Sequence, residues 1–323
     1  MQSFVGIDVS KSKLDVCVII ENSKIRKKVV KNSKFGFVAL KNWLMKFNLQ
    51  DPHICMESTG CYSEDVAIFF HDLNYKVSVV NPLMIKSFRN AKLVRQKTDS
   101  SDAYIIAEFC KQNTPSIWKP RDPDGKSLHE FLKRVESLSE RLCQITSQLE
   151  NKNLDKIIVN SIKKESRNLE KEIEKLNKIM MKIVQNNPEL KQKYELLSNI
   201  KGVGEKTALT ILADMPDVNY FKNSGQYVAF AGLSPSHFQS GTSVKGKSHI
   251  SKIGSKRIRK VLYMSALSVK RYNTDFAHFV QKMKSRGKAP KVIIVAIMRK
   301  LLCIFFGMLK KMENFDRKLA FFS

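Results

Sequence analysis

The sequence predicts an α/β N-terminal domain joined to an all-α remainder, in which an antiparallel coiled-coil arm precedes a helical C-terminal domain. Two observations predict this architecture. The first 115 residues alternate short β-rich runs with helix-like segments, and the next segment repeats apolar residues at heptad spacing. A chain of 323 residues is also too long for one compact core. We expect domains at residues 1–115, 116–188 and 189–323.

Three β-rich runs follow one another at the start of the chain, at residues 4–9, 14–20 and 24–31. Their short connections indicate an antiparallel meander. Helical and strand-like patterns then alternate. The expected elements are helices at about 35–47 and 62–73, strands at 53–56 and 76–80, and helical pieces up to about 113. Three antiparallel strands followed by β-α-β units form the order of an RNase H-like sheet.

The middle segment carries two seams in which apolar residues are separated alternately by three and four positions. The first seam consists of Leu128, Phe131, Val135, Leu138, Leu142, Ile145 and Leu149. The second consists of Ile162, Ser166, Leu169, Ile173, Leu176, Met180 and Ile183. They predict an arm over about 126–187 that ends at Asn187-Pro188. We interpret it as a dimerisation arm, because two helices leave apolar flanks uncovered; a bundle within one chain is the alternative.

The chain from residue 189 onward has helical patterns, with later helices expected at about 256–272, 275–284 and 289–311. Its first part predicts a helix-hairpin-helix, in which an apolar helix leads through Gly202 and Gly204 into a second helix that contains Lys206. Free N–H groups at a helix start bind phosphate, and glycine permits a close backbone approach. We therefore expect these three residues to contact a nucleic-acid backbone; an ordinary helix–helix turn is the alternative.

The net charge of the chain is +27, from 57 Lys and Arg against 30 Asp and Glu. Most of the excess lies in residues 198–323, which hold 23 basic and 6 acidic side chains, with no carboxylate between Asp217 and Asp275. A stretch of one sign favours phosphate contact over a merely solvated surface, and argues against a small-molecule substrate. The expected nucleic-acid contacts in this stretch are Lys245, Lys247, Lys252, Lys256, Arg257 and Arg259.

The six cysteines are scattered, without a Cys-x-x-Cys pair or the Cys/His spacing of zinc sites, which favours a reducing compartment. The N-terminus lacks the pattern of a signal peptide. The most apolar stretch, residues 292–309, is interrupted by Arg299-Lys300, so we expect a core helix and no membrane partner. The sequence thus predicts a cytoplasmic protein.

Four carboxylates stand near the ends of the N-terminal elements. Asp8 lies in the first strand, Glu57 directly follows the fourth, and Asp99 and Asp102 begin a helix with both side chains on one face. Gathered in one cleft, they would repel one another unless divalent cations lay among them, and Mg²⁺ prefers such oxygen ligands. A pair of ions about 3.5–4 Å apart stabilises the attacking and leaving oxygens of phosphoryl transfer.

Taken singly, two of these acids have ordinary interpretations. Asp99 could be a helix N-cap, and Glu57 could belong to a polar turn. Asp8 is harder to explain in this way, because its position in a Val-Gly-Ile-Asp-Val strand favours an apolar residue. The four together form a D-E-D-D set.

Four stretches of the chain carry a resemblance to a known family. They are Gly6-Ile7-Asp8-Val9-Ser10-Lys11, Met56-Glu57-Ser58-Thr59-Gly60, Lys97-Thr98-Asp99-Ser100-Ser101-Asp102-Ala103, and residues 231–254 with Gln239-Ser240-Gly241. They resemble the DEDD transposases of the insertion-sequence one-ten family, bridge-RNA-guided recombinases related to the Piv invertases. The resemblance covers essentially the whole chain. It implies a RuvC-like N-terminal domain, a coiled coil, and a C-terminal transposase domain that carries a catalytic serine.

The resemblance also implies the roles of single residues. Asp8, Glu57, Asp99 and Asp102 match the catalytic acids that bind two Mg²⁺ ions, and Ser240 matches the nucleophile that forms a phosphoserine link to DNA. In related enzymes the acids of one subunit and the serine of another complete one site. The implied partners are donor and target DNA, a non-coding bridge RNA and further copies of the chain, as a dimer or tetramer.

The sequence departs from the family pattern at Thr242, where a glycine commonly follows the Ser-Gly pair. Ser236, Ser243 and Ser248 are neighbouring alternatives to Ser240 as the nucleophile. Spacing from Gly232-Leu233 favours Ser240.

Three other functions remain open at this stage. A RuvC-like nuclease of the junction-resolvase type would use the same acids and an activated water, without a serine adduct. Residues 6–13 also resemble the first phosphate loop of actin-like sugar kinases, but a later Asp-x-Gly-Gly loop is missing and the charge does not suit a sugar. A non-catalytic nucleic-acid-binding protein is the third, which the presence of all five expected residues disfavours.

Overall fold

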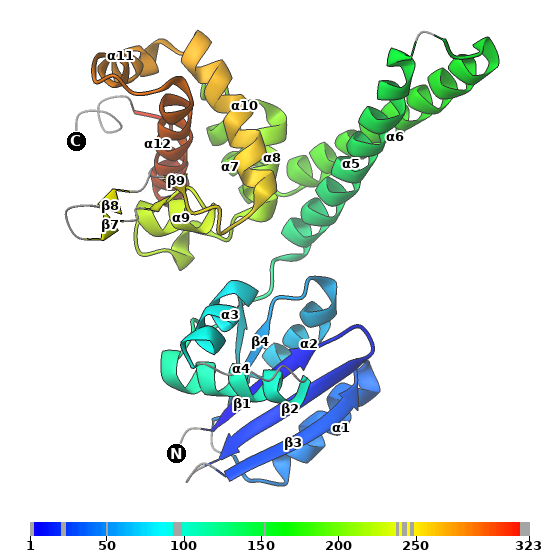
Figure 1. Ribbon diagram of the computed structural model, residues 1–323, viewed down its shortest axis with the longest axis vertical. Helices are drawn as coiled ribbons and strands as arrows, with labels where there is room; N and C mark the ends of the chain where they lie inside the picture. The colour runs from blue at the N-terminus through cyan, green and yellow to red at the C-terminus, as the bar shows by residue number, and fades with distance from the viewer. Residues whose placement is uncertain are drawn as a thin grey trace. The chain divides into compact units, whose positions relative to one another are not determined.

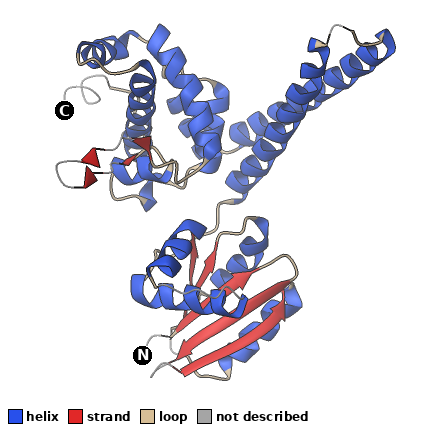
Figure 2. Ribbon diagram, viewed as in Figure 1, coloured by secondary structure: helices blue, strands red, loops and turns tan. Residues whose placement is uncertain are grey.

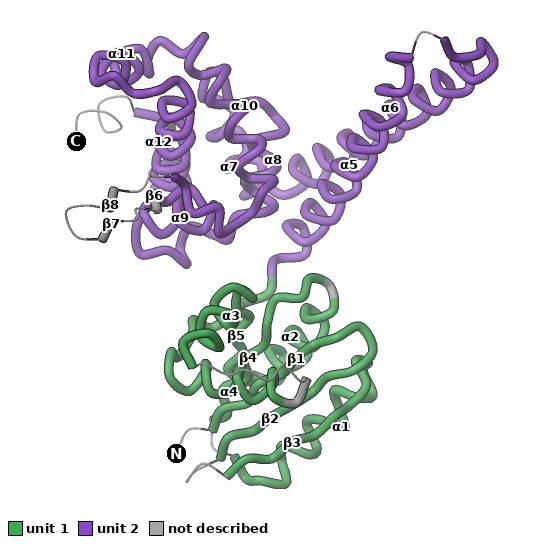
Figure 3. The backbone as a smooth tube through the Cα atoms, viewed as in Figure 1, with its two compact units in different colours: residues 1–120 green, residues 121–323 purple. Residues whose placement is uncertain are grey.

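The computed structural model describes residues 3–20, 24–49, 51–92, 99–151, 153–236, 239–240, 244–245 and 249–316. The chain forms two compact units, residues 1–120 and residues 121–323 (Figure 3). The first unit corresponds to the predicted α/β domain. The second contains both the predicted arm and the predicted C-terminal domain, and its further division at residue 188 stays a prediction.

The first unit contains a five-stranded sheet in the order β3-β2-β1-β4-β5 (Figure 1). Its strands are β1 (Phe4–Val9), β2 (Lys13–Ile20), β3 (Lys24–Lys31), β4 (His53–Glu57) and β5 (Lys76–Val80). Strands β1, β2 and β3 form the predicted antiparallel meander, and β4 and β5 add in parallel beside β1. This mixed α/β order is that of an RNase H-like domain.

Helices cover the two faces of this sheet (Figures 1 and 2). Helices α1 (Lys34–Met45) and α2 (Cys61–Asp72) pack on one face. Helices α3 (Pro82–Ala91) and α4 (Asp99–Asn113) belong to the other. The alternation of side chains along each strand supplies an apolar layer to both faces.

The second unit begins with two long helices, α5 (Pro123–Ser147) and α6 (Lys156–Asn186), joined by a short turn η2 (Gln148–Glu150). They lie side by side in Figure 1 and bury the residues Leu128, Leu132, Val135 and Leu138 of α5 and Leu176, Met180 and Val184 of α6. Leu132 and Val184 are more deeply buried than the predicted seam residues Phe131 and Ile183. The helix pair is observed, and interlocked coiled-coil packing and dimerisation stay predictions.

The rest of the second unit is mainly helical. Its longer helices are α7 (Pro188–Ser198), α8 (Glu205–Asp214), α9 (Ser224–Phe230), α10 (Lys256–Tyr272), α11 (Ala277–Ser285) and α12 (Pro290–Lys311), with short turns η3 (Val218–Tyr220) and η4 (Thr274–Phe276). The expectation of helices alone is wrong between α9 and α10. There the structure has two short ladders, β6 (Pro235–Ser236) with β9 (His249–Ile250) and β7 (Gln239–Ser240) with β8 (Val244–Lys245). Gly, Ser and Pro in this stretch disfavour a helix.

Helix α12 is long and apolar enough to cross a membrane by length and composition alone. In the structure most of it lies inside the second unit, where Ile297, Leu301, Leu302 and Phe305 are fully buried. This packing is that of a core helix, as the sequence predicts.

Candidate active site

Asp8 and Glu57 occupy neighbouring positions on two parallel strands. Strands β1 and β4 pair side by side as far as Ile7 and Met56, which are fully buried against α1 and α2. Successive side chains point to opposite faces, so Asp8 and Glu57 turn to the other face, on strands about 4.8 Å apart. Glu57 is the last residue of β4, so this strand ends one residue later than predicted from the sequence.

Helix α4 reaches this face because Gly6 has no side chain. A Cβ atom on Gly6 would lie 2.2 Å from the carbonyl oxygen of Ala103 and 2.3 Å from the amide nitrogen of Ala107, which no real side chain tolerates. Gly6 lies two residues before Asp8 and therefore on the same face of the sheet. The glycine thus allows the beginning of α4 to lie against β1, next to Asp8.

The direction of α4 places its first turn beside the acids. Near its other end, Sγ of Cys110 lies 3.8 Å from the carbonyl oxygen of His53, the first residue of β4. Helix α4 therefore runs opposite to β1 and β4, and its first residues lie at the strand ends that hold Asp8 and Glu57. Asp99 is the first residue of α4, and its side chain lies outside the described part of the structure.

The carboxylate of Asp102 is held by an arginine that the sequence analysis did not identify. Nη2 of Arg89, on α3, lies 2.6 Å from Oδ1 of Asp102, and both side chains are only about one-sixth exposed. The hydroxyl of Ser101 donates a weaker hydrogen bond to the same oxygen, at 3.3 Å. Arg89 is followed along the chain by a basic stretch, and its sequence context gave no signal that distinguishes it.

A fifth carboxylate, Asp15 on β2, is paired directly with Asp8 across the antiparallel ladder. It is 6% exposed, and Nζ of Lys13 lies 3.1 Å from its Oδ2. Like charges on directly opposite positions repel, and the ammonium group of Lys13 offsets part of this repulsion. The signal that indicates Asp8 also applied to Asp15, because Asp15 interrupts the apolar run of residues 14–20.

These carboxylates fit a hard divalent cation by their chemistry, since Mg²⁺ is bound mainly through oxygen. Among the side chains that the structure describes, however, no three of His, Cys, Asp and Glu are gathered closely enough to hold a metal ion. Two buried polar atoms of this unit, Thr59 Oγ1 and Arg89 Nε, have no hydrogen-bond partner in the described part. The acids share one end of the sheet, and Asp102 is engaged by Arg89.

Ser240 lies in the short hairpin of β7 and β8, where it pairs with Val244. Its side chain and those of Lys245 and Lys247 fall outside the described part of the structure. Arg259 joins the two ends of the surrounding segment. The Arg259 guanidinium donates to the carbonyl oxygens of Ala231, at 3.2 Å, and Gly254, at 2.9 Å.

Two glycines allow the chain to close on itself at the two ends of this segment. Gly232 has φ +73° and Gly254 has φ +147°, conformations that L side chains rarely adopt. A Cβ atom on Gly254 would lie 2.2 Å from the carbonyl oxygen of Phe230. Gly232 and Gly254 are therefore required by the backbone on either side of the segment that contains Ser240.

The proposed helix-hairpin-helix contacts differ in their surroundings. Gly202 has φ +99°, and a Cβ atom there would lie 2.8 Å from the backbone nitrogen of Val269, so contact with α10 already requires glycine. Nothing lies within 4 Å of a Cβ atom on Gly204, and Lys206 is exposed. Contact of a nucleic acid with Gly204 and Lys206 stays a prediction, as does the motif itself.

Arg257, which the sequence predicts to contact phosphate, forms an ion pair with Asp214. Its Nε donates to Oδ2 of Asp214 at 2.6 Å, and its Nη2 donates to Oδ1 at 2.9 Å. His129 of α5 bonds to the same carboxylate at 2.7 Å. Its guanidinium is engaged in this largely buried ion pair, and contact of Arg257 with phosphate stays a prediction. Lys252 and Lys256 are exposed, and their contact with phosphate also stays a prediction.

Asp214 is the centre of this network and is only 5% exposed. Burial alone would raise the pKa of its carboxyl, but the hydrogen bonds and positive charge of His129 and Arg257 outweigh burial and lower the pKa. The network joins α5, α8 and α10, so it fixes the base of the long helix pair to the helical core.

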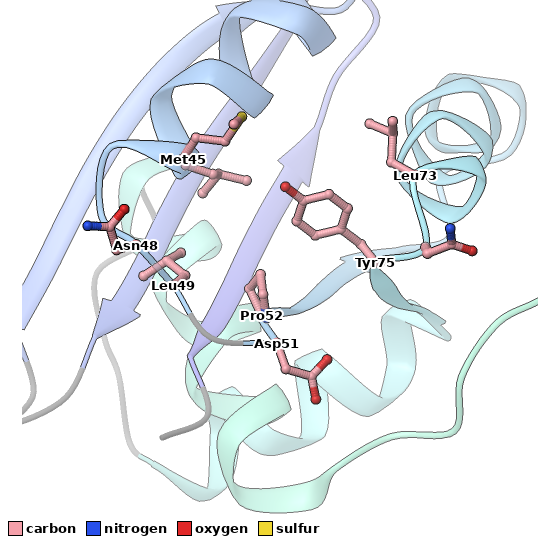
Figure 4. Close-up of a pocket in the computed structure, with 9 residues that line it drawn as sticks. Met45, Asn48, Leu49, Asp51, Pro52, Leu73 and Tyr75 are labelled. Atoms are coloured by element: carbon pink, nitrogen blue, oxygen red, sulfur yellow. The ribbon is translucent and has the colours of Figure 1, made fainter.

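A hollow of about 420 Å³ opens at the other end of the first unit, where β4 and β5 begin (Figure 4). Its lining residues are Leu44, Met45, Asn48, Leu49, Asp51, Pro52, Leu73, Asn74 and Tyr75. Tyr75 points into it from the start of β5, and apolar side chains face it from the ends of α1 and α2 (Figure 4). None of the D-E-D-D acids contributes to this hollow, so it is separate from the candidate active site.

Two transposase families match the two halves of the chain. Residues 5–158 match a DEDD family of IS110 elements described as transposase, and residues 194–281 match the transposase IS116/IS110/IS902 family. The first match contains all four D-E-D-D acids, and the second contains Ser240.

Three proteins are similar to this chain. The pilin gene-inverting proteins of Moraxella lacunata and Moraxella bovis are each 32% identical to it over 323 residues, with 98% of this chain and 99% of the relative covered. The chain belongs to the IS110 family of transposases. An uncharacterized 43.6 kDa protein of insertion element IS110 in Streptomyces coelicolor is 25% identical over 124 residues, which cover 38% of this chain and 30% of the relative.

Membership of the IS110 family makes this chain a transposase or recombinase, and therefore an enzyme that acts on DNA. The DEDD match also implies a general dependence on divalent metal. In this IS110 transposase, Asp8, Glu57 and Asp102 lie toward the end of the sheet where β1, β4 and α4 meet, and their role as catalytic acids stays a prediction.

Proposed function

We propose that this IS110 transposase cleaves and exchanges strands of donor and target DNA through a covalent phosphoserine link, guided by a non-coding bridge RNA. The observation that supports this most strongly is the meeting of Asp8, Glu57 and the first turn of α4 at one end of the sheet. The proposed place of action is the bacterial cytoplasm, where the DNA lies.

The acids are the proposed metal ligands. Asp8, Glu57, Asp99 and Asp102 would hold two Mg²⁺ ions, whose charge, once bound, stabilises the oxygens of a phosphodiester under attack. Arg89 binds Oδ1 of Asp102, so this carboxylate would contribute its other oxygen, Oδ2, to a metal ion. Arg89 would thereby fix the orientation of the ligand.

Ser240 is the proposed nucleophile. Its hydroxyl would attack the phosphorus of a DNA phosphodiester, the 3′ or 5′ oxygen of the broken bond would leave, and the serine would stay esterified to the cut end. A serine hydroxyl reacts poorly unless a base or a cation activates it. The acid site supplies that activation in our proposal, with acids and serine contributed by different subunits of a dimer or tetramer held together by the α5–α6 arm.

The names of the Moraxella relatives describe inversion of a pilin gene, which exchanges strands at two DNA sites. The same strand exchange is proposed for this chain.

A covalent trapping experiment tests the proposal. The full-length protein is incubated with Mg²⁺, its copurified RNA and a nicked DNA substrate that carries the recombination site, and then denatured. We expect a protein–DNA adduct from the wild type and from Ser236→Ala, the matched control, but none from Ser240→Ala. Cleavage without any adduct would overturn the serine route and identify a hydrolytic nuclease of the resolvase type. Sequencing of the copurified RNA tests guidance, because a guided enzyme enriches one structured RNA.

A further inference from the structure

Strand β3 forms a basic edge of the sheet in the first unit. It is the outermost strand on one side, and its sequence Lys-Ile-Arg-Lys-Lys-Val-Val-Lys has five basic residues and no acidic one. An exposed edge strand often carries lysine simply to prevent edge-to-edge association. The register of β3 shows that its basic residues are divided between the two faces of the sheet.

The even-numbered residues of β3 belong to the face covered by α1. Val30 is buried in the core beneath α1, and Nζ of Lys28 lies 5.6 Å from the centre of the Trp43 ring on that helix. Lys24 and Arg26 share this side by alternation. Lys24 and Arg26 therefore serve as control positions, because they lie on the same strand but on the face opposite to the acids.

The odd-numbered residues share the face of the acids. Val29 pairs with Asp15, and Asp15 pairs with Asp8, so one row crosses three strands from β3 to the candidate active site. At about 4.8 Å for each strand, Val29 lies about 10 Å from Asp8. Lys27 and Lys31 flank Val29 on either side, about 13 Å apart along the strand.

This part of the face is open. Ile25 is 40% exposed and Val29 is 59% exposed, and both Lys27 and Lys31 are exposed. Helix α4 packs against β1, β2 and β4. Beside α4, the sheet therefore offers two exposed lysines separated by apolar side chains, in line with the acids.

We propose that Lys27 and Lys31 bind the phosphate backbone of the DNA strand that enters the acid site, with Ile25 and Val29 beneath its sugars. The proposal rests on the proposed function, because it requires a DNA strand to be cut near Asp8. The exposed part of the face at β3 lies in the same row as Asp8 and Asp15, whose carboxylates themselves repel phosphate. By the spacings of the sheet the Cα atoms of both lysines lie about 12 Å from that of Asp8, so they would bind phosphates next to the acids without competing with the acids for a metal ion. DNA is chosen because it is the strand to be cut.

The salt dependence of DNA binding tests the proposal. The full-length protein binds a fluorescent 40-base-pair duplex in EDTA over a range of salt concentrations, and the double variant Lys27→Gln, Lys31→Gln is compared with Lys24→Gln, Arg26→Gln. Each phosphate contact contributes about 0.9 to the slope of log affinity against log salt. We expect the first variant to lose about 1.8 from this slope and the second to keep the wild-type slope. Equal slopes in the two variants would overturn the proposal.

Two further measurements keep the result specific. Because DNA bound elsewhere on a basic chain could mask the change, a photo-cross-linking amino acid replaces Val29 in one protein and Arg26 in another; only the first should capture DNA. If the variant at Lys27 and Lys31 loses affinity for single-stranded RNA alone, or only self-associates more, the DNA assignment is wrong. No strand is cut in EDTA, so failure of the serine mechanism would leave these results unchanged.

Discussion

The carbonyl oxygen of Ala103 lies 2.2 Å from the position that a Cβ atom would take on Gly6. This single contact sets how closely α4 approaches β1. Since Asp102 immediately precedes Ala103 and Asp8 follows Gly6 by two residues, the contact also sets the spacing between carboxylates on the helix and on the sheet. The geometry of the candidate active site therefore depends on a residue without a functional group.

Gly6→Ala is expected to separate α4 from β1. The obstructing atoms belong to the backbone, so the helix must shift, and overpacking of this kind costs about 1–3 kcal/mol of unfolding free energy. Urea denaturation measures the loss. Gly307→Ala is the matched control, because nothing lies within 4 Å of its Cβ position and alanine favours the helix. A Gly6→Ala protein as stable as the wild type would show that α4 is not held this closely.

Arg89→Met is expected to leave the largely buried carboxylate of Asp102 without its cation. Removal of one partner from such a pair costs about 3 kcal/mol, at the lower end of the range for buried pairs. Divalent cation should then stabilise the variant more than it stabilises the wild type, because metal replaces the lost charge. Thermal denaturation with and without Mg²⁺ measures both effects.

A double-mutant cycle separates this effect from lost packing. If Arg89 acts through Asp102, Arg89→Met should cost much less in an Asp102→Asn background. Additive losses would mean that Arg89 stabilises the fold independently of that carboxylate.

Asp214→Asn is expected to destabilise the second unit near neutral pH and to change its response to acid. The folded-state pKa of Asp214 is lowered, so its contribution to stability is present above the unfolded-state pKa of about 3.9 and is lost as the pH falls through the folded value. At pH 7 the variant should lose about 3–5 kcal/mol, because Arg257 is left buried without its partner. Denaturant titrations from pH 7 to pH 3 should show the difference from wild type narrowing below pH 4. A constant difference would contradict the ion pair.

Most of the first unit could be predicted from the sequence because strand and helix periods are strong local signals. The predicted meander at 4–9, 14–20 and 24–31 is confirmed, and β4 and β5 also appear where alternation and β-branched residues placed them. The two short ladders, β6 with β9 and β7 with β8, were not predicted, because strands of two residues have no measurable period. Their formation depends on backbone closure around Gly232 and Gly254.

The candidate site was only partly predictable. Asp8 was indicated because an acid in an apolar strand is costly, and the same argument would have found Asp15. Arg89 could not be found in this way, since its role depends on the packing of α3 against α4. The ion pair of Arg257 was missed for a similar reason: its basic neighbours suggested phosphate, while its partner Asp214 lies 43 residues away in sequence.

The most direct measurement is Mn²⁺ binding to the full-length protein, followed by electron paramagnetic resonance. Wild type is predicted to bind two ions per chain, with Asp8→Asn, Glu57→Gln and Asp102→Asn each losing affinity, while the exposed Asp72→Asn binds as the wild type does. Undiminished Mn²⁺ binding by the three acid variants, or none by the wild type, would contradict a shared cation site at the ends of β1, β4 and α4.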